Sequence, residues 1–62
     1  MRFIEVTNRR DGTRIAINAD TIHVVDEVKD HCHITILVDH KKTFCVCVKE
    51  SYHTVTAMLR EV

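Results

Sequence analysis

Apolar and polar residues alternate through most of the chain, which is the pattern of half-buried β-strands. We predict five strands, at residues 1–7, 14–18, 21–28, 31–38 and 43–48. β-Branched residues dominate these segments, as a pleated sheet prefers. Asp11-Gly12, between the first two strands, is a strong signal for a tight hairpin. Gly12 is the only glycine, so we expect a positive φ there.

The last segment has a different period, because its apolar residues recur every three or four positions, as on one face of a helix. These residues are Tyr52, Val55, Met58, Leu59 and Val62. Ser51 precedes them and is the predicted N-cap. The chain is therefore predicted to be mostly β with one C-terminal helix, in the order β-β-β-β-β-α. We expect an antiparallel five-stranded sheet or a small, partly open barrel, with residues 1–62 as a single domain.

The two faces of the predicted sheet are both partly apolar. The inward face is predicted to carry Ile4, Val6, Ile15, Ile17, Ile22, Val24, Ile34, Ile36, Val46 and Val48. The opposite face carries Phe3, Val25, Leu37, Cys45 and Cys47. A sheet with one face in water alternates more cleanly, so these five residues are predicted to contact another copy of the chain. The alternative is that sheet twist closes the strands into a barrel within one molecule.

Composition narrows the classes of function. Nine Lys and Arg residues balance nine Asp and Glu residues among 62, so a strongly basic nucleic-acid module is not expected. A hydrophobic fraction of 45% is that of an ordinary folded domain. No apolar run approaches the roughly 18 residues that span a membrane, and no signal peptide precedes the first strand. We therefore expect a cytoplasmic protein without a membrane partner.

Cysteine and histidine occur in two neighbouring strands, as His31-Cys32-His33 and Cys45-Val46-Cys47. Residues i and i+2 of a strand lie about 6.6 Å apart along its axis, which is too far for two thiolates on one zinc ion. An odd number of cysteines in a reducing compartment also argues against disulfides. We expect no metal, no cofactor and no disulfide.

A nucleophilic enzyme needs a thiol or hydroxyl beside a base, with donors for an oxyanion. His33 can approach Cys47 across strands, but apolar neighbours such as Leu37 disfavour a thiolate there. Ser51 is assigned to the helix cap, and no Gly-rich phosphate loop or paired-carboxylate motif is present. We therefore expect a protein without enzymatic activity.

Positive charge gathers at two turns. Arg9, Arg10 and Arg14 surround the first hairpin turn, and residues 40–42 form a second basic turn. Arginine can clamp a phosphate or carboxylate through two N–H groups, although charged turn residues are often simply hydrated. In a homo-oligomer, copies of such patches can converge on one pocket. The predicted ligand-binding residues are Arg9, Arg10, Arg14, His31 and His33.

Four stretches of the chain match a known pattern. They are Ile4-Glu5-Val6-Thr7, Gly12 in the first hairpin, Ile17-Asn18-Ala19-Asp20 before Ile22, and Val48-Lys49-Glu50-Ser51-Tyr52 before Val55. Through them residues 4–59 resemble the FlbD family of small proteins, named for an association with flagellar gene clusters. The resemblance implies a β-rich fold. The turn at residues 39–42 departs from the family's usual Asn/Asp-Gly turn. A weaker likeness, over residues 15–59, is to the LytTR-type DNA-binding domain.

FlbD-like small chains are also similar to proteins of phage and prophage genomes. By size and composition the chain resembles the compact oligomeric sponge proteins with which phages sequester nucleotide immune signals, although no motif is shared. We therefore expect a homo-oligomer that captures a small anionic, nucleotide-type ligand, acting in the host cytoplasm as an anti-defence protein if a phage encodes it. The alternatives are an FlbD-type motility accessory protein and a LytTR-like DNA-binding module, which zero net charge disfavours.

Overall fold

The computed structural model describes residues 2–62 and contains five strands, one 3-10 turn and one helix. The elements are β1 Phe3–Thr7, β2 Arg14–Asn18, η1 Ala19–Thr21, β3 Ile22–Val28, β4 His31–Leu37, β5 Thr43–Val48 and α1 Tyr52–Glu61. The predicted order of strands and helix is confirmed. Met1, which was included in the first predicted strand, lies outside the described residues.

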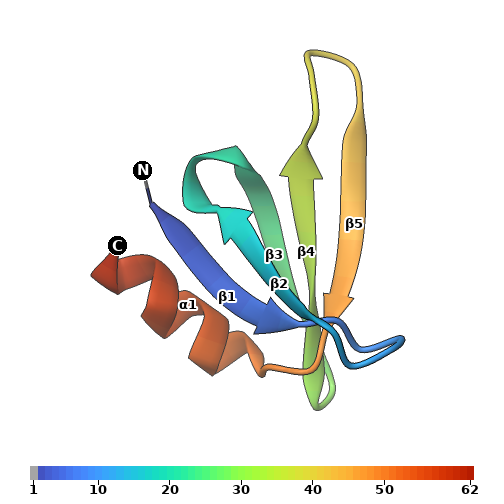
Figure 1. Cartoon of the computed structure of the whole chain (residues 1–62), viewed down its shortest axis with the longest axis vertical. Helices are drawn as coiled ribbons and strands as arrows, with labels where there is room; N and C mark the ends of the chain where they lie inside the picture. The colour runs from blue at the N-terminus through green and yellow to red at the C-terminus, as the bar shows by residue number, and fades with distance from the viewer. Residues whose placement is uncertain (1) are drawn as a thin grey trace.

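The strands form two antiparallel sheets, β1-β2 and β3-β4-β5. The sheets meet at one end, where Asn8 bridges Val48 and the Arg9 amide donates to the Cys47 carbonyl at 2.9 Å. Beyond this junction β1 runs away from β5, so the hairpin and the larger sheet splay apart (Figure 1). The predicted single five-stranded sheet is therefore not found, and the strands do not close into a barrel.

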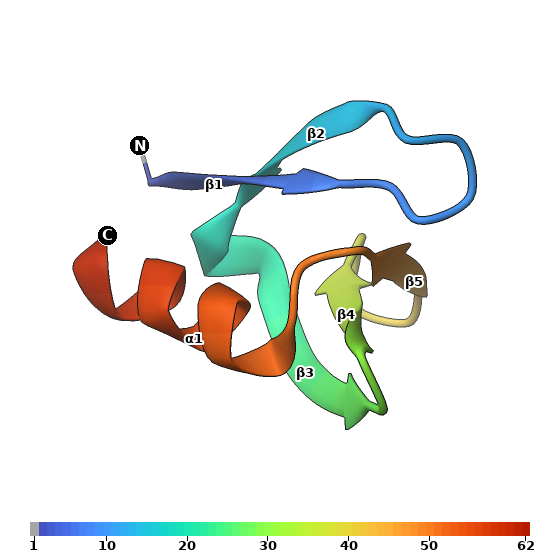
Figure 2. The same ribbon diagram turned by 90° about the horizontal axis from the view of Figure 1, so that it is seen from below.

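Helix α1 closes one side of the space between the sheets. Ser51 caps it as predicted, because its Oγ accepts a hydrogen bond from the Thr54 amide at 3.2 Å. The helix packs against β1 and β3, and its Val55 side chain is fully buried. Figure 2 shows α1 below β1 and beside β3, on the far side of the molecule from β5. The β5 side therefore has no helix to cover it.

The core lies where the two sheets and α1 meet. Its buried residues are Ile4, Val6, Ile17, Cys32, Ile34, Val46, Val48 and Val55. Ile15, Ile22 and Ile36 pack against this cluster and are half-buried. Most of the predicted inward face is thus confirmed.

Strand β3 is the exception, because its register changes between Ile22 and Val24. After this irregularity Val24 pairs with Thr35, and Val25 pairs with Ile34. A slip of one residue moves the side chains that follow to the opposite face of a sheet. Val24, predicted to face inward, is therefore 39% exposed, whereas Val25 packs against the core. The predicted placement of Val25 on an outer, interface-forming face is wrong.

The first hairpin turn has the backbone that its sequence predicts. Gly12 has a φ of 79°, in the left-handed region that side chains disfavour. A Cβ atom at this position would meet nothing closer than the Lys49 Nζ, at 3.9 Å. The glycine is therefore required by its backbone conformation and not by lack of space.

Candidate functional site: a groove between the two sheets

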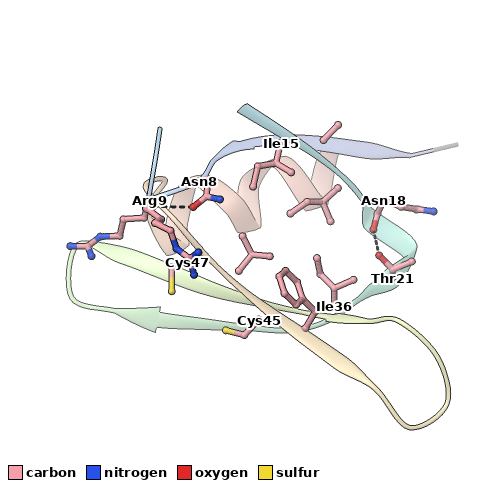
Figure 3. Close-up of a pocket in the computed structure, with 13 residues that line it drawn as sticks. Asn8, Arg9, Ile15, Asn18, Thr21, Ile36, Cys45 and Cys47 are labelled. Atoms are coloured by element: carbon pink, nitrogen blue, oxygen red, sulfur yellow. Dashed lines mark hydrogen bonds between the residues drawn. The ribbon is translucent and has the colours of Figure 1, made fainter. Parts of the chain in front are cut away.

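The side of the core that α1 leaves uncovered is open. A groove of about 580 Å³ lies there, between the hairpin and the β4-β5 pair (Figure 3). Its walls are apolar, with Ile15 and Ile17 contributed by β2 and Ile36, Phe44 and Val46 contributed by β4 and β5. Sites for small molecules have volumes of about 300–1,000 Å³ and mostly apolar linings, so the groove has the size and character of such a site.

The two ends of the groove are polar. Arg9 and Arg10 line it at the hairpin turn, whereas Asn18 and Thr21 line it at η1. Asn8 holds the hairpin turn, because its side-chain oxygen accepts a hydrogen bond from the Arg10 amide at 2.9 Å. None of the described residues that line the groove is acidic. The described lining of the groove therefore includes positive side chains and no negative one, although the net charge of the chain is zero.

Backbone groups also border the groove. Ala16 and Cys45 line it, although they alternate with the inward residues Ile17 and Val46 and so have their side chains on the outer faces. They must reach the groove mainly through their peptide groups. Within residues 2–62 no backbone hydrogen bond joins β2 to β5. The groove thus offers N–H and C=O groups beside its apolar walls.

The structure divides the predicted cluster of three arginines. Arg9 and Arg10 line the groove, but Arg14 does not. The Arg14 guanidinium lies 3.4 Å from the Glu50 carboxylate and 3.9 Å from that of Glu5. Arg14 begins β2 and faces these two carboxylates, so its charge is already balanced within the fold.

The predicted residues His31 and His33 lie on the outer face of β4, and neither lines the groove. Their ring centroids are 5.4 Å apart, and the His31 Nδ1 lies 3.2 Å from the Asp30 Oδ1. The pKa of Asp30 is lowered, first by its hydrogen bond with His31 and in smaller part by the positive charge of Arg9. Arg9 therefore acts electrostatically on the turn beside His31 as well as on the groove.

Glu50 ties the hairpin to the start of α1. Its carboxylate accepts hydrogen bonds from the Thr7 amide at 2.8 Å and from the Thr7 hydroxyl at 2.9 Å, and its side chain is 17% exposed. Partial burial acts to raise the pKa of Glu50, but the hydrogen bonds from Thr7 and the charge of Arg14 outweigh it and lower the pKa. Glu50 is thus a structural anion, and it does not line the groove.

The predicted interface residues do not share one surface. Leu37, Cys45 and Cys47 are exposed on the outer face of the β3-β4-β5 sheet. Val24 joins this outer-face patch, because the register change turns its side chain to that face. Phe3 is also exposed, but it belongs to the hairpin and not to this sheet.

The three cysteines are free thiols. Cys32 is buried, and burial raises the pKa of its thiol, with the charge of Glu50 adding to the effect. Its thiol is therefore neutral and unreactive at neutral pH. Within residues 2–62, His, Cys, Asp and Glu side chains form no group of three or more that suits a metal ion.

Comparisons with protein-family models, with curated proteins and with solved structures gave no match to this chain. The resemblance to the FlbD family therefore stays a prediction. In the part of the chain that the structure describes, no helix combines the length and the apolar character needed to cross a membrane.

Sequence reasoning did not find the groove itself. Phe44 alternates along β5 with the buried residues Val46 and Val48, so its side chain is on the inward face. It is nevertheless 61% exposed. Alternation tells which face of a strand a side chain occupies, but not whether another layer covers that face. The splayed arrangement of the two sheets was not readable from the pattern.

Proposed function

We propose that the protein is a non-enzymatic binding protein that captures a small anionic ligand of the nucleotide type in the groove between its two sheets. The ligand's phosphate groups contact Arg9 and Arg10, and its flat apolar part lies against Phe44 and Ile36. The proposal retains the predicted role of Arg9 and Arg10 and leaves Arg14 out of the site.

The observation that carries the proposal is the charge distribution of the groove. Its described lining includes two arginines and no carboxylate, although the whole chain has equal numbers of basic and acidic residues. Arginine forms paired, charge-assisted hydrogen bonds with phosphate, each contributing about 1.5–3 kcal/mol. Apolar walls next to such an anion site suit a ligand with a ring system attached to phosphate.

The side chains that line the groove support a protein that binds its ligand without converting it. Its described side chains are aliphatic, aromatic, amide, hydroxyl, thiol and guanidinium groups. Cys45 and Cys47 border it from strand positions that alternate with the inward residues. We therefore expect the ligand to be bound and released unchanged, as in a protein that sequesters a signal.

Titration calorimetry with AMP, ADP-ribose and a cyclic dinucleotide tests the proposal, with adenosine and inorganic phosphate as partial ligands. At least one nucleotide should bind more tightly than either partial ligand, and chromatography should recover it unchanged. Arg9→Ala and Arg10→Ala should each weaken binding about tenfold or more, since each removes a charge-assisted contact. The matched control is the double variant Lys41→Ala, Lys42→Ala, which removes positive charge from an exposed turn outside the groove.

The proposal fails if no nucleotide binds, or if the control variant weakens binding as much as the arginine variants do. A salt-sensitive shift of duplex DNA in place of nucleotide binding would favour the LytTR-like alternative. Arg10→Lys separates charge from geometry. It keeps the positive charge but loses the bidentate clamp, so it should bind less well than the parent protein and better than Arg10→Ala.

A further inference from the structure

Strand β5 has an edge that the fold leaves largely unpaired. On one side it pairs with β4 along its length. On the other side it is bonded only near Val48, where the Arg9 amide donates to the Cys47 carbonyl and the Lys49 amide donates to the Thr7 carbonyl. Natural proteins protect such edges with charged residues, proline or a covering element. The segment Thr43–Val48 contains no charge and no proline, and α1 lies elsewhere, against β1 and β3. The edge is therefore suited to pairing with another strand.

The register tells which backbone groups are free. The Cys47 carbonyl accepts from the Arg9 amide, so the peptide groups of Cys47 point away from β4. Peptide groups alternate in direction along a strand, so those of Cys45 and Thr43 also point outward. Within residues 2–62 neither residue has a backbone hydrogen bond to another element on that side. Two residues thus present free N–H and C=O groups in a row.

We propose that a second copy of this chain pairs with the edge in antiparallel fashion, with the twofold axis at Phe44. Thr43 of each copy then lies opposite Cys45 of the partner subunit, and the four free groups of each copy are satisfied. A strand that pairs antiparallel with its own copy is self-complementary, which a twofold contact requires. The inference goes beyond the proposed ligand binding and does not rest on it.

Hydrogen bonding favours this register over its neighbour. An axis one residue later, at Cys45, would pair Thr43 with Cys47 of the partner subunit, whose carbonyl is already bonded to Arg9. An axis at Phe44 uses only groups that are free in the single chain.

The same contact accounts for the exposure of Phe44. At 61% exposed in the single chain, its ring would lie beside Phe44 of the partner subunit, in the closely spaced type of pair that does not exchange backbone bonds. Two three-stranded sheets become one continuous sheet. Because Cys45 borders the groove through the same peptide groups, the partner's strand would lie along this edge of the groove.

Sedimentation of Thr43→Pro beside Thr43→Val tests the contact. Thr43 is the first residue of β5 and its N–H points outward, so proline removes no hydrogen bond of the single chain. It removes two of the four hydrogen bonds between copies, and the dimer dissociation constant should rise about tenfold or more. Thr43→Val keeps the N–H and should dimerise as the parent protein does. A parent protein that is monomeric at high micromolar concentration overturns the proposal.

Cross-linking tests the register even if the proline variant is poorly folded. In a Cys47→Ser background, Thr43→Cys should form a disulfide with Cys45 of the partner subunit, because opposite Cα atoms of such a pair lie about 5.5 Å apart. Lys42→Cys is the control, since its side chain lies on the other face and should not cross-link. Equal cross-linking of both variants overturns the proposal. So does a dimer that Leu37→Glu abolishes and Thr43→Pro leaves intact, because it would use the outer face of the sheet.

Discussion

The two sides of the space between the sheets differ in what covers them. On one side α1 lies against β1 and β3, Val55 is fully buried, and Glu50 binds Thr7 at the helix start. On the other side Ile15 and Phe44 face a groove that no element fills. The apolar residues on both sides follow the same alternating pattern. The position of one short helix therefore decides which of them form a closed core and which line an open groove.

Replacing one isoleucine in each strand of the hairpin by alanine tests this difference most directly. Ile4 is 2% exposed in β1, whereas Ile15 in β2 is half-buried at the groove. Ile4→Ala should lower the free energy of unfolding by about 2–5 kcal/mol, since it leaves a cavity in a closed core. Ile15→Ala should lower it by about 1 kcal/mol, because water already reaches that side chain. Urea unfolding of both variants measures the difference. Equal losses would mean that the groove is closed in solution.

The next largest effect concerns the anchor on the covered side. Glu50→Ala leaves the amide of Thr7 without its acceptor and should lower the free energy of unfolding by about 1.5–3 kcal/mol at pH 7. Glu50→Gln keeps a carbonyl acceptor and should lose less. Chemical denaturation of the two variants beside the parent protein measures both losses.

The lowered pKa of Glu50 also predicts that the stability of the fold depends on pH. The pKa of Glu50 is lower in the folded chain than its usual 4.5, so its ionised form stabilises the fold. This contribution is complete above the unfolded pKa and is lost as the pH falls through the lowered folded pKa. The stability difference between the parent protein and Glu50→Gln should therefore be constant near neutrality and shrink below about pH 4.5. A difference that grows on acidification would contradict the assignment.

A smaller effect is expected at the helix cap. The Ser51 Oγ accepts from the Thr54 amide, and Ser51→Ala removes this bond. The free energy of unfolding should fall by about 1 kcal/mol, as for other N-caps. Ser51→Asp should retain most of the stability, because aspartate caps equally well and suits the positive end of the helix. Thermal unfolding followed by circular dichroism compares the three proteins.

Much of the fold was predictable because local rules decide it. Alternation located the strands, Asp11-Gly12 marked the hairpin, and Ser51 marked the start of α1. The pairing of strands into two separate sheets was not predictable, because it depends on where β1 parts from β5. The sequence pattern also placed Val24 inward and Val25 outward, which is the reverse of the structure, for a related reason. A register irregularity leaves no mark in a run of similar residues.

The candidate site was predictable only in part. Charge clustering at a turn pointed to Arg9 and Arg10, which do line the groove. It also included Arg14, which is adjacent in sequence but pairs with Glu50, a residue 36 positions away. Long-range partners of this kind cannot be inferred from one turn. The histidines were grouped with the arginines on residue type alone, and the register turns them to another face.

Replacing Arg14 should have the smallest effect on stability. It also tests most directly whether Arg14 is outside the site that Arg9 and Arg10 line. Its side chain is 60% exposed, and its contacts with Glu50 and Glu5 are 3.4 Å and 3.9 Å long. Exposed ion pairs contribute about 0–1 kcal/mol, so Arg14→Ala should lower the free energy of unfolding by less than about 1 kcal/mol, with Thr7 still holding Glu50. Its effect on nucleotide binding should be under about twofold, against the roughly tenfold loss expected of Arg10→Ala. Calorimetry on the two variants under one salt condition measures the contrast. An Arg14→Ala variant that binds as weakly as Arg10→Ala would show that the anion site spans all three arginines, with Glu50 displaced when the ligand enters.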